Sequence, residues 1–291
     1  MKVVGKIVGI NTSDGLFNLL IVDQNEETYN LKTELNTFVV GKVYEFEVEM
    51  NVGERISYSI LKYINVEDLN YKKTDEILRN FLPSSPISLE EATTVVYSYI
   101  AKIDNKVIKS ITKYLIDKNS EKYFIYPAAS ILHHACVGGL AYHCIGMLKF
   151  ADSFIENYPY LNKDYLYSGI ILHDLGKIKE LSGIQKTEYS LDGHLLGHLV
   201  MGALEISKAA VALGLEGAKE VEILEHMLIS HHGQPQFGAA KRPMTPEAIA
   251  LWYIDTIDSK FRVLGEELNK TESGHFTENI GVLDRIKVYK E

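Results

Sequence analysis

The hydrophobic pattern of this 291-residue chain changes character part-way along, and that change limits the architectures open to it. Residues 1 to about 65 hold short segments rich in β-branched and aromatic residues, whereas residues 88 to about 265 carry apolar residues at helical spacing. A polar, charged connector separates the two parts. We therefore expect a β domain at residues 1–68, a linker at 69–87 and a helical domain at 88–291.

Three strands are expected in the N-terminal part, at Lys2–Ile10, Leu16–Val22 and Val43–Met50. In the third, Val, Phe and Val alternate with Tyr, Glu and Glu, which indicates a strand with one buried face. Asp14-Gly15, between the first two strands, is a hairpin signal. Several short strands in so few residues predict a small barrel, with an OB-like barrel as the leading candidate.

The rest of the chain is expected to be helical, apart from a strand-like tail at Ile280-Gly281-Val282. Ser88 followed by Glu91 is the capping-box pattern that begins a helix. Thr245-Pro246 likewise predicts the start of the last helix. The fold class is thus mainly α, an all-helical domain preceded by a small β-barrel. Other helical stretches are expected at about 107–116, 133–157, 164–175, 194–213 and 219–231.

Charge and composition argue against several functional classes. The net charge of −9 disfavours a chain that simply coats nucleic acid, because phosphate binding needs clustered Lys and Arg. No apolar run approaches the roughly 20 residues that a membrane span needs, and Met1–Lys6 lacks the apolar stretch of a signal peptide. Cys136 and Cys144 are expected to be reduced. We therefore expect a cytoplasmic protein with no membrane partner.

Residues that can bind metal recur through the helical part, most clearly in the pair His173-Asp174 at the end of an apolar run. Imidazole and carboxylate together suit Mn²⁺, Fe²⁺, Ni²⁺ or Zn²⁺. Asp174 has two oxygens and can bridge two ions, which imidazole cannot. The candidate ligands exceed what one ion needs, so two ions sharing a carboxylate are expected, an arrangement typical of hydrolysis. They are His143, His173, Asp174, His198, His231, His232 and Asp255.

Two pairs of residues leave a choice of ligand. His194 and His198 are four residues apart, on one face of the expected helix, and one of them could contact substrate instead of metal. Asp255 and Asp258 are three apart on the last helix. Asp255 is expected to be the more buried of the two, and Asp258 to lie behind the ligands or on the surface.

Lys177 would lie one helical turn beyond Asp174 if that helix continues, where it could hold a phosphate oxygen. A solvated lysine is the alternative. The doublet His133-His134 could donate to phosphate, and a packing or surface role is equally open.

His143, the pair His173-Asp174 and Asp255 follow one another in an order that resembles the signature of the HD-domain metal-dependent phosphohydrolase superfamily, His…His-Asp…Asp. The additional histidines, His198 and His231-His232, resemble those of binuclear members such as the HD-GYP phosphodiesterases. The GYP signature itself is missing here. In such enzymes the first His, the His-Asp pair and the final Asp serve one ion, while the middle histidines and the shared Asp serve the other. The resemblance therefore implies one ion at His143, His173 and Asp255 and another at His198, His231 and His232, with Asp174 between them.

The chain is more closely similar to the YhaM-type 3′→5′ exoribonuclease family, which joins an N-terminal OB-fold to a C-terminal HD domain. The similar strings lie at residues 133–140, 196–198, 230–233 and 241–248. In that family the position of His194 is typically not a ligand, which favours His198.

The N-terminal part departs from this family. Residues 1–70 hold six Lys or Arg against eleven Asp or Glu, a net of −5, whereas single-strand binding by OB-folds relies on a positive groove and stacking aromatics. About half of the aromatic residues in this part are expected in the core. The six are Phe17, Tyr29, Phe38, Tyr44, Phe46 and Tyr58.

The sequence predicts a metal-dependent phosphodiesterase, a 3′→5′ exoribonuclease that releases nucleoside monophosphates from single-stranded RNA or DNA. Asp174 and Lys177 are the expected catalytic residues, and His133, His134 and His194 are candidate substrate contacts. We expect two divalent ions, Mn²⁺ first, with Fe²⁺, Ni²⁺, Co²⁺, Mg²⁺ or Zn²⁺ as alternatives. Two other functions stay open, an HD-type hydrolase of a nucleotide or cyclic dinucleotide and a nucleic-acid-binding regulatory protein with a structural metal site. A homo-oligomer is also open.

Overall fold

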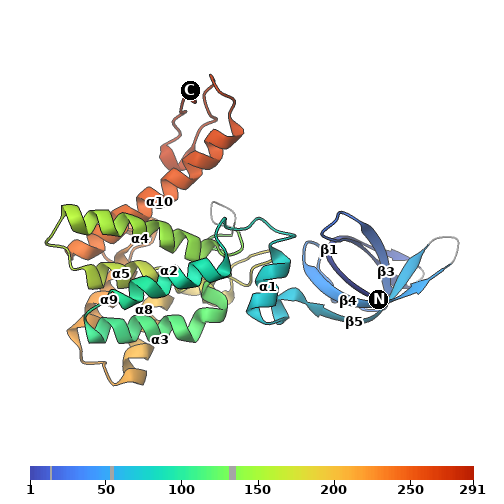
Figure 1. Ribbon diagram of the computed structural model, residues 1–291, viewed down its shortest axis with the longest axis horizontal. Helices are drawn as coiled ribbons and strands as arrows, with labels where there is room; N and C mark the ends of the chain where they lie inside the picture. The colour runs from blue at the N-terminus through green and yellow to red at the C-terminus, as the bar shows by residue number, and fades with distance from the viewer. Residues whose placement is uncertain (14, 53–55, 131–135) are drawn as a thin grey trace. The chain divides into compact units, whose positions relative to one another are not determined.

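The chain forms two compact units (Figure 1). One unit holds Met1–Ser84 with Gly183–Thr187, and the other holds Ser85–Ser182 with Glu188–Glu291. Within the part of the chain that is described, no helix is both long and apolar enough to cross a membrane. The computed structural model describes residues 1–13, 15–52, 56–130 and 136–291.

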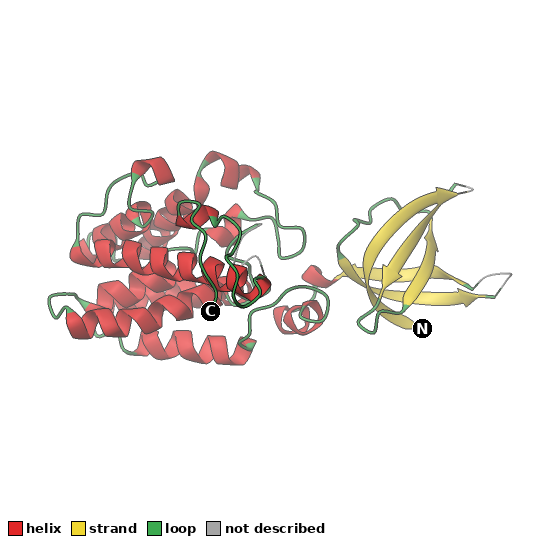
Figure 2. Cartoon of the chain, turned by 90° about the horizontal axis from the view of Figure 1, so that it is seen from above, coloured by secondary structure: helices red, strands yellow, loops and turns green. Residues whose placement is uncertain are grey.

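The described residues of the first unit form five strands that close into a barrel in the order β1-β2-β3-β5-β4 (Figure 2). Neighbouring strands are antiparallel except for β3 and β5, which are parallel. The predicted small barrel is therefore confirmed. Ser13 pairs with Leu16 at the expected hairpin, and Asp14 lies outside the described residues. The strands are β1 (Lys2–Ser13), β2 (Leu16–Val22), β3 (Thr28–Thr33), β4 (Val43–Asn51) and β5 (Ser57–Asn65).

Alternate residues of β4 fill the barrel core. Tyr44, Phe46 and Val48 are buried in the core cluster, because residues two apart on a strand share a face. The expectation that this tyrosine lies on the polar face is wrong, since its ring packs edge-on against Phe38 with 5.3 Å between centroids. As expected, half of the six aromatic residues are in this core, namely Phe38, Tyr44 and Phe46, and Phe17, Tyr29 and Tyr58 pack partly buried against it.

Five residues from far along the chain also belong to the barrel unit. Oε1 of Glu67 accepts the backbone N–H groups of Ile184 and Gln185 at 2.7 and 2.6 Å. The side chain of Gln185 is buried and donates to Asn65. After β5 the chain forms a short 3₁₀ helix, η1 (Val66–Asp68), and the helix α1 (Tyr71–Leu78). Helix α1 lies within the segment that the sequence predicts as a linker.

The second unit is helical (Figure 1), with α5 among the other helices. Helix α5 contacts α2, α3, α4, α9 and α10, and its residues from Leu166 to Leu172 are all buried. Ser88 and Thr245 cap their helices as predicted, by accepting the N–H groups of Glu91 and Ala248. The helices are α2 (Leu89–Ala101), α3 (Lys106–Tyr123), α4 (Gly139–Asn157), α5 (Lys163–Leu172), α6 (Lys177–Glu180), α7 (Leu191–Leu195), α8 (Gly197–Leu213), α9 (Lys219–Ser230) and α10 (Pro246–Lys270), with 3₁₀ helices η2 (Pro235–Phe237) and η3 (Gly281–Leu283).

Three expected elements differ from the structure. The stretch 194–213 is two helices, because Gly197, the first residue of α8, has φ of +73°, a left-handed conformation that glycine adopts readily and that separates α8 from α7. The helix expected to run through residue 175 ends at Leu172, and Lys177 begins a separate helix. The tail at Ile280–Val282 is a 3₁₀ turn with an isolated bridge, not a strand.

A buried carboxylate on α8 connects three helices of this unit. Glu205 is 3% exposed, and its oxygens accept hydrogen bonds from Lys118 on α3, Lys179 on α6 and Lys208 on α8. Burial raises the pKa of Glu205, but the hydrogen bonds from Lys179 and Lys208 outweigh it and lower that pKa to about 2. The ionised carboxylate therefore stabilises the folded state.

Replacing Glu205 with Gln is expected to lower the free energy of unfolding at neutral pH by about 1–3 kcal/mol, since the lysine partners are half exposed. The folded-state pKa is depressed, so this stabilisation is fully present above about pH 4.5 and is lost as the pH falls toward 2. Urea unfolding at pH 7 and at pH 3 measures the difference in the free energy of unfolding between wild type and Glu205→Gln. The difference should shrink at pH 3, and an equal difference at both values would contradict the account.

Candidate metal centre

The structure brings the seven expected metal-capable residues together around the end of α5. They form three overlapping groups in which the candidate ligand atoms lie within 4.8 Å of one another. The groups share His173 and His231, so all seven residues belong to one cluster. They come from α4 (His143), the end of α5 (His173 and Asp174), the start of α8 (His198), the end of α9 (His231 and His232) and α10 (Asp255).

Two glycines allow these elements to approach closely. A Cβ at Gly176 would lie 2.2 Å from the backbone oxygen of His198, so the turn after Asp174 packs directly on the start of α8. Gly233 has φ of +76° and ends the segment after α9. A Cβ there would lie 1.9 Å from the ring of Trp252. Both contacts need glycine. The first brings the start of α8, with His198, close to Asp174, and the second brings the segment after His232 against Trp252 of α10.

Backbone carbonyl groups orient three of the imidazole rings. Nδ1 of His173 lies 2.8 Å from the oxygen of Ile170, and Nδ1 of His231 lies 2.7 Å from that of Leu228. Nδ1 of His232 lies 2.8 Å from the oxygen of Phe237. A carbonyl oxygen accepts only, so Nδ1 carries the proton and Nε2 keeps its lone pair. Each ring therefore presents a nitrogen that can coordinate a metal.

Behind the rings of His198 and His143, a carboxylate takes the place of the backbone carbonyl group as the partner of Nδ1. Nδ1 of His198 lies 3.0 Å from Oε1 of Glu180, which also accepts the backbone N–H of His198. Nδ1 of His143 lies 2.8 Å from Oδ2 of Asp258. Both carboxylates are buried. A carboxylate behind a metal-binding imidazole fixes the ring and increases its basicity.

Three buried nitrogen atoms face Asp174. Nε2 of His173 lies 3.3 Å from Oδ2, whereas Nε2 of His198 and of His231 lie 3.4 and 3.8 Å from Oδ1. None of the three nitrogens forms a hydrogen bond with any residue that the structure describes. A buried polar atom left unpaired costs roughly 1–3 kcal/mol, and neutral imidazole nitrogen is a common metal ligand. This donor set fits divalent cations.

The protonation states also suit metal binding. Burial raises the pKa of Asp174, but its interactions with His173 and with the ammonium group of Lys177 hold that pKa well below its ordinary value. Burial lowers the pKa of His231 and of His232, which keeps both rings neutral. At His143 burial acts in the same direction, but hydrogen bonds with Asp255 and Asp258 raise the pKa to about 9. A cation at His143 therefore has to displace a proton.

Comparisons with known proteins identify the family. Residues 140–260, which span all seven candidate ligands, match the HD domain family. The chain is 40% identical over 266 residues to the 3′-5′ exoribonuclease YhaM of Bacillus subtilis, a match that covers 91% of this chain and 81% of that protein. The chain belongs to the YhaM family.

Two further relatives carry the same name. The chain is 39% identical over 267 residues to the 3′-5′ exoribonuclease YhaM of Bacillus licheniformis, covering 92% of this chain and 81% of that protein. It is 44% identical over 211 residues to the one from a Geobacillus strain, covering 72% of this chain and 65% of that relative's length.

Four predicted site residues of this YhaM-family chain are not among the seven candidate metal ligands, namely His133, His134, Lys177 and His194. The ring of His194 on α7 packs against Tyr189, with 5.4 Å between ring centroids, and His194 is in none of the candidate metal groups. Because α7 and α8 are separate helices, it does not share a helical face with His198. His133 and His134 lie outside the described residues. Nζ of Lys177 is 2.7 Å from Oδ2 of Asp174, in a partly buried ion pair.

The expectation that Asp255 is more buried than Asp258 is wrong. The Asp255 side chain is 18% exposed and that of Asp258 only 3%. Asp255 belongs to the candidate metal centre, with Oδ1 3.2 Å from Nε2 of His143. Asp258 is buried because it lies behind the ring, where Arg262 also pairs with it. Sequence reasoning missed Glu180 altogether, since it precedes its partner His198 by 18 residues and no spacing rule connects them.

Replacing Glu180 with Gln is expected to weaken binding of one Mn²⁺ ion by about 10–100-fold, because the ring of His198 loses its charged partner. Asp258→Asn should do the same through His143. Calorimetric titration of each variant with Mn²⁺ measures this, with Glu188→Gln, an exposed glutamate, as the matched control. Wild-type affinity in both variants would show that these carboxylates do not support the ligands.

Proposed function

We propose that this chain holds two divalent metal ions in its helical unit and removes nucleoside monophosphates from the 3′ end of single-stranded RNA. One observation carries the proposal, namely that imidazole nitrogens from two groups of buried or partly buried candidate ligands lie 3.3 and 3.4 Å from the two oxygens of a single ionised carboxylate, Asp174. The relatives' name, 3′-5′ exoribonuclease, supports RNA as the substrate and the direction of attack. The proposed sets are His143, His173 and Asp255 for one ion and His198, His231 and His232 for the other.

Paired divalent ions in such a site supply a water of lowered pKa and stabilise charge on the attacking and leaving oxygens of a phosphoryl group. Mn²⁺ is the proposed ion, with Fe²⁺, Ni²⁺, Co²⁺, Mg²⁺ or Zn²⁺ as alternatives, since availability selects among them as much as affinity does. The residues of the chain keep the ligands in place. Burial of His173, Asp174 and His231 excludes bulk water, which strengthens charge interactions among them.

Lys177 is proposed to act at both the carboxylate and the substrate. Its ammonium group holds Oδ2 of Asp174, and an ammonium has three protons, so two are available to a phosphate oxygen. Its pKa is raised: burial lowers it, but the charge of Asp174 outweighs burial. Lys177 therefore stays cationic at neutral pH. We propose that it orients the bridging carboxylate and neutralises charge on the scissile phosphate.

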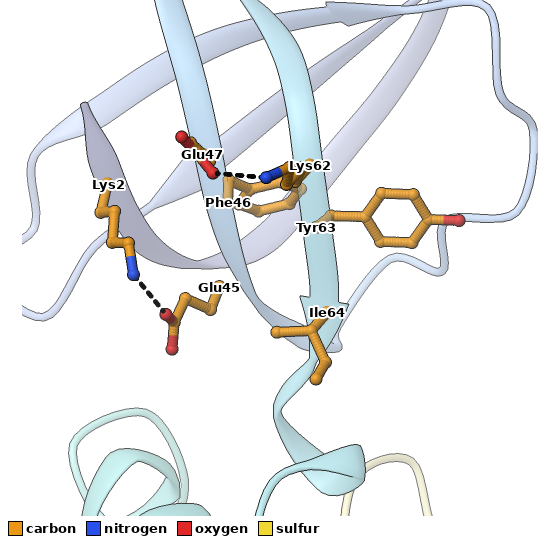
Figure 3. Close-up of a pocket in the computed structure, with 7 residues that line it drawn as sticks. All are labelled: Lys2, Glu45, Phe46, Glu47, Lys62, Tyr63 and Ile64. Atoms are coloured by element: carbon orange, nitrogen blue, oxygen red, sulfur yellow. Dashed lines mark ion pairs between the residues drawn. The ribbon is translucent and has the colours of Figure 1, made fainter.

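We also propose that the barrel is OB-like, because its strand order and the parallel β3–β5 pair fit a five-stranded Greek-key barrel. Its charges do not favour phosphate. A depression of about 220 Å³ on β1, β4 and β5 (Figure 3) holds two ion pairs, Lys2–Glu45 and Lys62–Glu47. We therefore expect the barrel to contribute stacking, for example through the exposed Tyr63, more than charge.

Wild-type protein with Mn²⁺ is expected to shorten a 5′-labelled single-stranded RNA in one-nucleotide steps. Asp174→Ala should abolish this activity, because both proposed ions lose a shared ligand. Asp104→Ala, at an exposed aspartate, is the matched control and should keep it. Products are resolved by length on a denaturing gel, and full activity in Asp174→Ala would contradict the proposal.

The same assay on single-stranded DNA, a mononucleotide and a cyclic dinucleotide separates the alternatives. Cleavage of the small molecules alone would favour a nucleotide hydrolase. Bound metal without turnover of any phosphoester would favour a regulatory protein with a structural site. Cleavage of DNA at a similar rate would extend the substrate class, since the phosphodiester is common to both polymers.

A further inference from the structure

The lysines around Glu205 form a cluster in which positive charge exceeds negative charge. Nζ of Lys118, Lys179 and Lys208 lie 3.3, 2.6 and 3.0 Å from its carboxylate oxygens. One carboxylate balances one ammonium, so two positive charges remain. The three lysine side chains are 46, 47 and 61% exposed, whereas that of Glu205 is 4% exposed. The ammonium groups therefore reach solvent while the acid does not.

The cluster lies on the same elements as the metal centre. Glu205 follows His198 by seven residues on α8, which is close to two helical turns, so both lie on one face about 10 Å apart along the axis. Lys179 is on the four-residue helix α6, which begins with Lys177, the ion-pair partner of Asp174. Both connections place the cluster near the proposed site of cleavage.

A depression of about 450 Å³ adjoins the cluster. Its lining includes Lys179 and also Lys122, which lies one turn after Lys118 on α3. Ser182 adds a hydroxyl group, whereas the hydroxyl of Ser190, which also lines the depression, already donates to the backbone oxygen of Lys179. Asp192 is the acidic residue among the lining residues that the structure describes. Lysine and hydroxyl groups are those that proteins use to hold nucleic-acid phosphates.

We propose that Lys118, Lys122, Lys179 and Lys208 bind backbone phosphates of the single-stranded RNA whose 3′ end enters the metal centre. This inference rests on the proposed function and names where that substrate is held. Each lysine bonded to Glu205 uses one of its three protons there and keeps two for phosphate oxygens. Because Glu205 already positions three of the lysines, binding costs less side-chain entropy than at unpaired lysines.

The charge distribution explains why such a surface is needed. The chain carries a net charge of −9, and residues 1–70 are acidic. In the barrel unit the hydroxyl of Tyr29, a candidate for base stacking, lies 3.0 Å from Oε2 of Glu27 and 3.5 Å from Oδ2 of Asp23. Phosphate binding there would bring like charges together. A lysine cluster in the helical unit supplies the missing positive charge.

The double variant Lys118→Gln/Lys208→Gln tests the proposal. It leaves Lys179 bonded to Glu205 at 2.6 Å, so the buried carboxylate keeps a counter-charge and the fold is expected to persist. The control Lys113→Gln/Lys270→Gln removes two charges from exposed ion pairs elsewhere in the same unit. Thermal unfolding compares the stability of the two variants.

Binding is measured by fluorescence anisotropy with a labelled RNA of about 12 nucleotides, whose 3′-terminal linkages are phosphorothioates to slow hydrolysis. The logarithm of the affinity is plotted against that of the salt concentration between about 50 and 200 mM. For the cluster variant the slope should become shallower by about 1.4, since each lost phosphate contact removes about 0.7 on a single strand. A slope and affinity equal to those of the control would overturn the proposal.

Kinetics distinguish a binding role from a structural one. The cluster variant should raise KM for the long RNA and leave kcat, and both constants for a dinucleotide, unchanged. Equal effects on both substrates, with a lower melting temperature, would point to structural damage and overturn the proposal. If wild type binds RNA in this way but cleaves none, the proposed function fails and the binding surface stands. If wild type cleaves RNA and the cluster variant matches the control, the proposed binding surface fails and the proposed function stands.

Discussion

The helical unit depends on one buried carboxylate, that of Asp174. Burial alone would favour its neutral form, and an uncompensated charge in the interior is expensive. Lys177 pairs with one oxygen, but three buried imidazole nitrogens also face the group without a hydrogen bond to any described residue. Divalent cations between the carboxylate and the imidazoles would satisfy all of these atoms at once. We infer that folding of this region and metal binding are coupled.

That constraint accounts for much of the surrounding structure. Five of the seven candidate ligands lie at helix ends and starts, where the chain can change direction, while His143 and Asp255 lie within α4 and α10. Two glycines remove the Cβ atoms that would separate the segments. Behind the rings, carbonyl oxygens and two carboxylates set the orientation. The helices of this unit thus fix the positions of the candidate ligands, and the turns after α5 and α9 add further ones.

Sequence patterns predicted the parts that depend on local chemistry. The change from alternating to helical spacing predicted a barrel followed by helices, and cap residues predicted two helix starts. The order of His and Asp residues predicted a set of side chains that the structure brings within coordination distance of one another. Their roles as ligands stay a proposal, as does the cytoplasmic location.

Contacts between residues far apart in the sequence determine the features that sequence patterns did not predict. Glu180 reaches His198 only because the turn after Asp174 folds back on α8, and Asp258 is buried by its contact with His143. The left-handed Gly197 separated His194 from His198, although their spacing suggested a shared face. Residues 183–187 join a unit formed by residues far earlier in the chain. None of these features leaves a periodic signal.

The most direct test of two ions sharing Asp174 is anomalous X-ray scattering from crystals of the full chain grown with Mn²⁺, recorded at the manganese absorption edge. The account predicts two peaks, one among His143, His173 and Asp255 and the other among His198, His231 and His232, each within coordination distance of an Asp174 oxygen. A single peak, or two peaks of which one makes no contact with Asp174, would contradict it.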